Sequence, residues 1–197
     1  MTPPAATPVA VLRRRGYALE AVTLGWNVVG VVVLTVIALG SGSVAIVGFG
    51  LDSLIEIGAS IVVIWELSGT GEARRARALR IIAVAFLLLA VYLVGQAALA
   101  LLTQLRPSDG PAGVVWTGVT AIVMFLLAAG KAATGRRLGD PVLIAEGRVT
   151  TVDGLLAVAV LIGLALDALL GWWWADPLAA LVIVVYAVRE AVHLLRG

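Results

Sequence analysis

The chain has 197 residues, of which 61% are hydrophobic and only 13% charged, and its mean hydropathy is +1.08. Soluble domains carry about twice this share of charged residues, so the composition excludes an ordinary soluble enzyme and predicts an integral membrane protein. The formal net charge is +2 and cysteine is absent, which excludes disulfides and thiolate metal sites. Membrane topology explains the excess of basic residues better than nucleic-acid binding does, because no soluble basic face is predicted.

Six apolar segments each approach or exceed the roughly 20 residues that a helix needs to cross a bilayer. We therefore predict an all-α, polytopic membrane protein with six transmembrane helices in one domain, residues 16–197. Residues 1–15 are rich in proline and small residues and end on three arginines, which predicts a disordered basic tail. The predicted helices cover residues 17–39, 44–67, 81–105, 114–133, 142–170 and 177–195.

The first predicted helix carries two polar residues, Glu20 and Asn27, which share a face because they lie seven residues apart. Glu20 lies near the helix end, where we expect its side chain to extend to the membrane interface. For Asn27 we expect a contact between helices, with a contribution to a polar path as the alternative.

The second predicted helix carries two carboxylates, Asp52 and Glu56, inside an apolar run where charge is costly. Four residues apart, they lie on the same face of the helix, about 6 Å apart along its axis. Two carboxylates at low dielectric repel each other unless a cation, a proton or a hydrogen-bond donor lies between them. The pair therefore predicts a cation site that is loaded in exchange for protons.

The next two predicted helices carry fewer candidate site residues. The third, residues 81–105, is polar only near its far end, so we expect it to face lipid or another subunit. The fourth, residues 114–133, has no ionisable residue before Lys131. We assign Lys131 to the basic residues at one membrane surface, where it would offer nothing to a site in the middle of the membrane.

The fifth predicted helix repeats the feature of the second, because Asp153 lies at about the same depth as Asp52. Glu146 and Asp167 lie seven residues before and fourteen residues after Asp153 and thus on the same face. We infer a polar path along the two helices. From the cytoplasm outward, its members are Glu66 and Glu146, then Asp52, Glu56 and Asp153, and then Asp167.

Acids near helix ends have a simpler alternative explanation. Glu66 and Glu146 would then be interfacial residues kept hydrated by their long side chains. For Asp167 the polar path and the outer interface are equally good interpretations. For Asp52, Glu56 and Asp153 we favour a functional polar cavity, because the middle of the membrane has too few basic residues to pair with three acids.

Positive charge is concentrated on one side of the predicted bundle. Twelve of the fourteen Arg and Lys residues flank that side, Lys131 among them, and Arg106 flanks the other. The positive-inside rule then places both the N and the C terminus in the cytoplasm. We expect a multi-pass protein of a prokaryotic inner (plasma) membrane.

The motif Asp52-Ser53-Leu54-Ile55-Glu56-Ile57-Gly58-Ala59-Ser60 resembles the second helix of the cation diffusion facilitator (cation efflux) transmembrane domain. Residues 145–163 and 174–180 resemble its fifth helix and the start of its sixth. The resemblance implies a bundle of the first, second, fourth and fifth helices with the third and sixth alongside, usually as a homodimer. It also implies that Asp52, Glu56 and Asp153 bind the transported metal.

By the same resemblance, the protein is not an enzyme but a divalent metal transporter that exports Zn²⁺ in exchange for protons, with no permanently bound cofactor. Mn²⁺, Co²⁺ and Cd²⁺ are alternative substrates. Val149 stands where the family commonly has a histidine, four residues before Asp153. Thr150, another side chain, a backbone carbonyl or water would have to complete a tetrahedral site, and a site made only of oxygen ligands suits Mn²⁺ or Mg²⁺ better than Zn²⁺.

Two other functions stay open at this point. One is a partner subunit of the same fold that has lost a metal ligand and modulates another protein without transporting. The other is an intramembrane aspartyl enzyme that uses Asp52 and Asp153. We favour the enzyme least, because the flanking residues do not resemble the motifs of such enzymes and a third nearby acid has no role in them.

Overall fold

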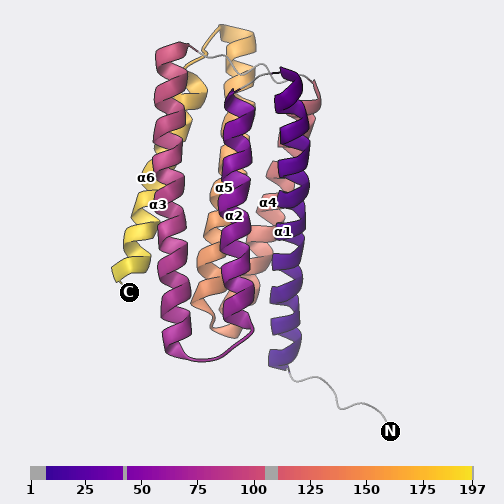
Figure 1. The fold of residues 1–197 in the computed structure, drawn as a ribbon, viewed down its shortest axis with the longest axis vertical. Coiled ribbons are helices and arrows are strands. Elements are labelled where there is room, and N and C mark those ends of the chain that lie inside the picture. The colour runs from indigo at the N-terminus through magenta and orange to yellow at the C-terminus, as the bar shows by residue number, and fades with distance from the viewer. Residues whose placement is uncertain (1–7, 42–43, 105–110, 197) are drawn as a thin grey trace.

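The computed structural model describes residues 8–41, 44–104 and 111–196, and all six elements in these ranges are helices (Figure 1). Within the helices, the side chains of residues 37–41, 44–52, 111–113, 164, 167, 168, 176 and 179 lie outside the description. The all-α prediction is confirmed. The helices are α1 (Pro8–Ser41), α2 (Val44–Leu67), α3 (Glu72–Thr103), α4 (Pro111–Leu138), α5 (Pro141–Leu170) and α6 (Ala175–Arg196).

Three helices extend beyond their predicted spans on the basic side. Residues 8–15 belong to α1, so the prediction of a disordered tail is wrong for them. Pro8 suits the first turn of a helix, and the Ala, Leu and Arg residues that follow favour helix. For the same reason α3 begins at Glu72, well before residue 81, and α4 continues to Leu138. Basic charge therefore lies on helical extensions and not in loops.

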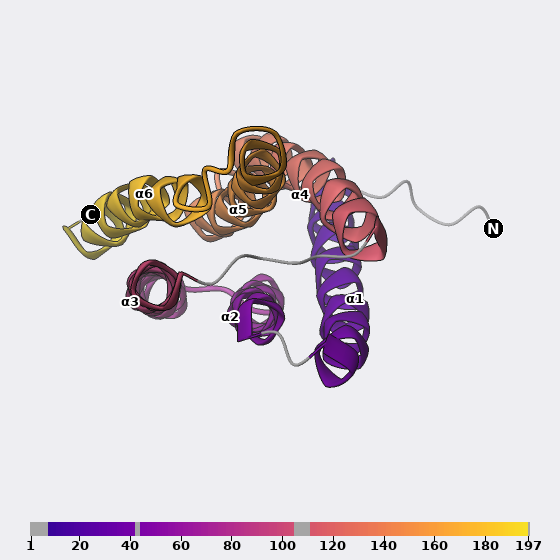
Figure 2. The ribbon, with the colours of Figure 1, turned by 90° about the horizontal axis from the view of Figure 1, so that it is seen from above.

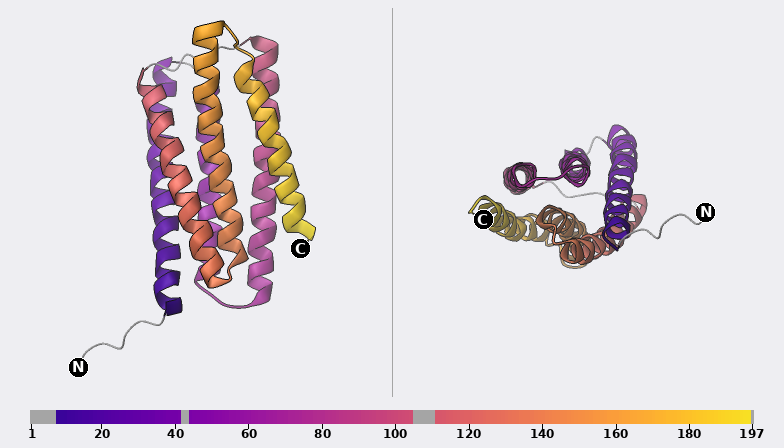
Figure 3. Two further views of the ribbon diagram at one scale, coloured as in Figure 1. Left: turned by 180° about the vertical axis from the view of Figure 1, so that it is seen from behind. Right: turned by 90° about the horizontal axis from the view of Figure 1, so that it is seen from below.

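The helices form two facing rows. Seen along the bundle, α1, α2 and α3 make one curved row and α4, α5 and α6 the other (Figure 2), which is also visible from behind (Figure 3). The most extensive contacts join α4 to α5, α3 to α6 and α1 to α2. The start of α1, the α2–α3 connection and the α4–α5 turn all lie at one end of the bundle, here called the basic end (Figure 1).

The surface has the apolar character of a membrane protein. In the described part of the chain, three segments are long and apolar enough to cross a membrane, namely Pro8–Val36, Glu72–Thr103 and Val114–Leu138. Large apolar side chains such as Val91, Ile122 and Val182 point outward and are well over half exposed, as lipid-facing residues would be. The prediction for α3 holds for one side only, because its other side packs against α6.

The interior is divided into an apolar half and a polar half. The buried apolar cluster draws its residues from α2, α3, α5 and α6, for example Val63, Phe86, Val149 and Ile183. Buried polar and charged side chains gather instead on α1, α2, α4 and α5. Those are the four helices that the family resemblance implies as the transport bundle. We expect the functional site in the polar half, because a buried charge is costly without a polar or charged partner and the buried polar side chains gather there.

A short turn brings α4 and α5 together in the polar half. Gly139 has φ 63°, a backbone conformation that glycine adopts without strain. Asp140 then begins α5, because its Oδ1 accepts hydrogen bonds from the backbone N–H groups of Val142, at 2.9 Å, and Leu143, at 3.3 Å, as an N-cap does. The resulting antiparallel hairpin sets residues near the end of α4 opposite residues near the start of α5.

Candidate ion-binding site

A buried lysine lies at the centre of the polar half. Lys131, on α4, is fully buried, and its Nζ donates hydrogen bonds to Glu146 Oε1 at 2.5 Å and to Thr150 Oγ1 at 3.0 Å, both on α5. Nζ also lies 3.3 Å from Glu20 Oε2 on α1, which makes an ion pair. The lysine thus joins α1, α4 and α5 through one ammonium group.

Close approach of α4 and α5 makes this contact possible. A Cβ atom built on Gly147 would lie 3.2 Å from Lys131 Cβ and 3.4 Å from the backbone oxygen of Ala128, so a larger residue would push the helices apart. The hydroxyl of Ser60, on α2, adds a further hydrogen bond to Glu146 Oε1, at 3.3 Å. The carboxyl of Glu146 therefore contacts groups from two other helices.

Two predictions from the sequence are wrong here. Lys131 and Glu20 were placed at the membrane surface, yet both are fully buried, and so is Glu146, which excludes the interfacial alternative for that residue. The reason is partly length, because α1 and α4 extend beyond their predicted ends and Lys131 lies about 10 Å inside the end of α4. The second reason is charge pairing, because oppositely charged groups on facing helices meet inside the bundle and need not reach water.

The predicted metal-binding acids are partly described. Glu56 on α2 and Asp153 on α5 are both buried, at 2% and 5% exposure, and they are electrostatic neighbours, with Lys131 also within range of Glu56. Among the described side chains, no hydrogen-bond donor lies within 3.5 Å of either carboxylate oxygen of Glu56, whose nearest charged neighbour on α5 is Asp153. The expectation that acids of α2 and α5 face each other holds for this pair. The side chain of Asp52 lies outside the described residues, so its role stays a prediction.

The auxiliary residues separate into groups. The side chains of Lys131, Glu20, Glu146 and Thr150 are here called the lysine cluster. Thr150 belongs to it because its Oγ1 accepts a hydrogen bond from Lys131 and donates one to the backbone oxygen of Glu146 at 3.3 Å. Asn27 is buried and donates from Nδ2 to the backbone oxygen of Thr23 at 3.0 Å, within its own helix. The side chain of Asp167 lies outside the described residues. Of these three, the structure ties only Thr150 to the described acids.

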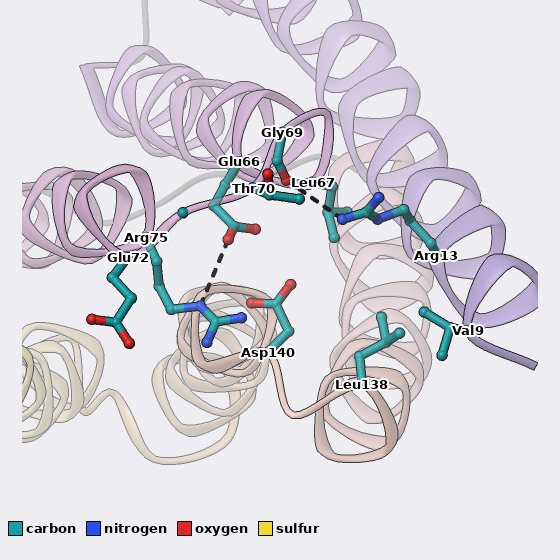
Figure 4. A pocket seen from close by; sticks show the side chains of 11 residues that line it. Val9, Arg13, Glu66, Leu67, Gly69, Thr70, Glu72, Arg75, Leu138 and Asp140 are labelled. Carbon is teal, nitrogen blue, oxygen red and sulfur yellow. Dashed lines mark hydrogen bonds and ion pairs between the residues drawn. The ribbon is translucent and has the colours of Figure 1, made fainter.

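A pocket of about 260 Å³ opens at the basic end of the bundle (Figure 4). Its charged lining residues are the acids Glu66, Glu72 and Asp140 and the arginines Arg13 and Arg75. Arg75 Nε lies 3.8 Å from Glu66 Oε1, and Arg13 donates to the backbone oxygen of Gly69 at 3.4 Å. Glu66, which the sequence places first on the predicted path from the cytoplasm, lies about 15 Å along α2 from Glu56.

No complete metal site is formed by the side chains that the structure describes. None of their groups brings three or more His, Cys, Asp or Glu residues into position around one ion. Glu56 and Asp153 supply two acids, and Asp52, the third predicted ligand, is outside the description. Val149 is buried in the apolar cluster, so at that level of α5 the polar side is provided by Glu146 and Thr150.

Comparisons with known proteins place these helices in context. A family model for the cation efflux transmembrane domain matches residues 78–197, which include Lys131, Glu146 and Asp153. An uncharacterized transporter from Synechocystis is 28% identical over 171 residues, an alignment that covers 79% of this chain and 54% of that protein. The chain therefore spans about half the length of this relative.

Proposed function

This chain belongs to the cation efflux family, and on that premise we propose that it transports a divalent metal cation across a membrane. The observation that carries the proposal is the buried acid pair of Glu56 and Asp153, which lie within electrostatic range of each other. Two buried carboxylates beside each other are costly unless a cation or a proton compensates them. Asp52, one turn from Glu56 on α2, is the third proposed ligand.

Exchange with protons follows from the chemistry of the acids. Carboxylates must lose their protons to bind a metal, so metal binding and proton binding compete at the same oxygen atoms. In the proposed cycle, Asp52, Glu56 and Asp153 capture the ion from the basic end, the bundle changes its accessible side, and protons from the other side displace the ion. We place the basic end in the cytoplasm by the positive-inside rule, so the direction is export.

The identity of the metal is a separate proposal. Zn²⁺ is the expected substrate, with Mn²⁺, Co²⁺ and Cd²⁺ as the other candidates. Oxygen ligands alone favour the harder ions, and the burial of Val149 in the apolar cluster supports a site without a nitrogen ligand there. A homodimer in a prokaryotic inner membrane likewise remains a prediction.

Proteoliposomes test transport directly. Purified protein is reconstituted with a metal-sensitive dye and a pH-sensitive dye inside, and metal is added with and without a pH gradient. We expect Glu56→Gln and Asp153→Asn each to lower metal flux at least tenfold. Glu190→Gln is the matched control, because Glu190 lies on α6, pairs with Arg148 and belongs neither to the acid pair nor to the pocket at the basic end, and its flux should equal that of the wild type.

Two outcomes would contradict the proposal. If Glu56→Gln and Asp153→Asn both moved metal at the wild-type rate, these acids would not form the transport site. If the wild-type chain alone bound metal but carried neither metal nor protons, the partner-subunit function would replace the transporter.

A further inference from the structure

The lysine cluster holds a cation that belongs to the protein itself. Among the described side chains, Lys131 is the only buried lysine or arginine. Three oxygen atoms surround its ammonium, from Glu146 at 2.5 Å, Thr150 at 3.0 Å and Glu20 at 3.3 Å. Carboxylate and hydroxyl oxygens in this number are also what a hard divalent cation takes, with water completing its shell.

The cluster has two carboxyl groups for its one ammonium. Glu20 and Glu146 supply two carboxylates for one positive charge, and both are fully buried. Glu20 Oε1 and Glu146 Oε2 have no hydrogen-bond partner in the described structure. These two oxygen atoms are therefore available as further ligands for a cation of higher charge than the ammonium.

We propose that Glu20, Glu146 and Thr150 form a second cation site whose occupant is the tethered ammonium of Lys131. While the ammonium is in place, a metal ion that approaches Glu146 meets a positive charge 2.5 Å from the carboxylate oxygen, and repulsion excludes it. The tether therefore limits the bundle to one metal ion, bound at Glu56 and Asp153. This limit rests on the proposed function, whereas the second site itself does not.

Removing the ammonium should open the second site. Lys131→Met keeps most of the length of the side chain and removes its charge. We expect purified wild-type protein to bind one equivalent of Mn²⁺ per chain in equilibrium dialysis, and Lys131→Met to bind two. Adding Glu146→Gln to Lys131→Met should return the count to one, because the new site loses a carboxylate.

Arg148→Met is the matched control. Arg148 is on α5, beside Glu146 in the sequence, but it pairs with Glu190 on α6 and is 38% exposed. Its replacement removes one positive charge, as Lys131→Met does, without opening the lysine cluster, so the count should stay at one. An equal count for Lys131→Met and wild type would overturn the proposal, as would an extra equivalent that survives Glu146→Gln.

A single substitution keeps the proposal testable if Lys131→Met does not fold. Glu146→Gln in the wild-type background leaves Lys131 paired with Glu20, so the affinity for Mn²⁺ should stay within threefold of wild type. A tenfold or larger loss would make Glu146 a ligand of the first site and overturn the proposal.

The same measurements separate this proposal from the transporter function. If Glu56→Gln removed the wild-type equivalent and Lys131→Met added none, the second site would be wrong and the transport site would stand. If wild type bound no Mn²⁺ and Lys131→Met bound one equivalent, the second site would stand and the proposed transport site would lose its support.

Discussion

Replacing Lys131 by methionine removes one buried charge at nearly constant side-chain length. The ammonium lies 2.5 Å from Glu146 Oε1 and 3.3 Å from Glu20 Oε2, and all three side chains are fully buried. With an effective dielectric constant of about 20, Coulomb's law gives attractions of about 7 and about 5 kcal/mol at these distances. Desolvation of the charges opposes most of this attraction, so both figures are ceilings on the net stabilisation.

The expected loss is set by the charges that stay behind. Without Lys131, no other buried cation among the described side chains lies between Glu20 and Glu146, and removing one partner of a buried pair costs about 3–5 kcal/mol. We expect the free energy of unfolding of Lys131→Met to fall by this amount. Arg148→Met should cost about 0–1 kcal/mol, because a partly exposed pair is screened by solvent.

Unfolding in mixed micelles with increasing sodium dodecyl sulfate, followed by circular dichroism, measures both differences. Lys131→Met/Glu146→Gln should recover part of the loss, because one of the two uncompensated carboxylates is gone. A Lys131→Met protein within about 1 kcal/mol of wild type would refute the reasoning, since the ammonium would then not hold the acids of α1 and α5 inside the bundle.

Two further substitutions test how the hairpin places these residues. Gly147→Ala should destabilise the protein by about 1–3 kcal/mol, because the new Cβ crowds Lys131 and the α4 backbone. Gly58→Ala is the control, because no atom lies within 4 Å of its new Cβ, and it should be neutral or stabilising by up to about 1 kcal/mol. The same unfolding assay compares the two variants, and equal effects would argue against close packing of α4 on α5. Asp140→Ala should cost about 0.5–2 kcal/mol through loss of the α5 N-cap, and Asp140→Asn should retain most of the stability, so equal losses in thermal unfolding would contradict the capping role.

The local pattern of residues was enough to predict the class of the fold and the acids of one helix pair. Long apolar runs leave a bilayer-spanning helix as the simplest structure, because backbone groups must bond within the segment. The spacing of Asp52 and Glu56 places both on one face of α2 whatever surrounds them. Depth along α5 then suggested Asp153 as their partner, and the structure brings Glu56 and Asp153 into electrostatic range.

The lysine cluster could not be predicted in this way, because its members come from α1, α4 and α5. Spacing along one helix says nothing about the rotation and axial position of another, and Lys131 seemed to lie at a membrane surface because helix-favouring basic residues were counted as loop. The contact depends on the tight turn at Gly139 and on the missing side chain of Gly147. Only packing of the helices decides whether a buried charge meets its counterion, since that contact acts over a few ångströms.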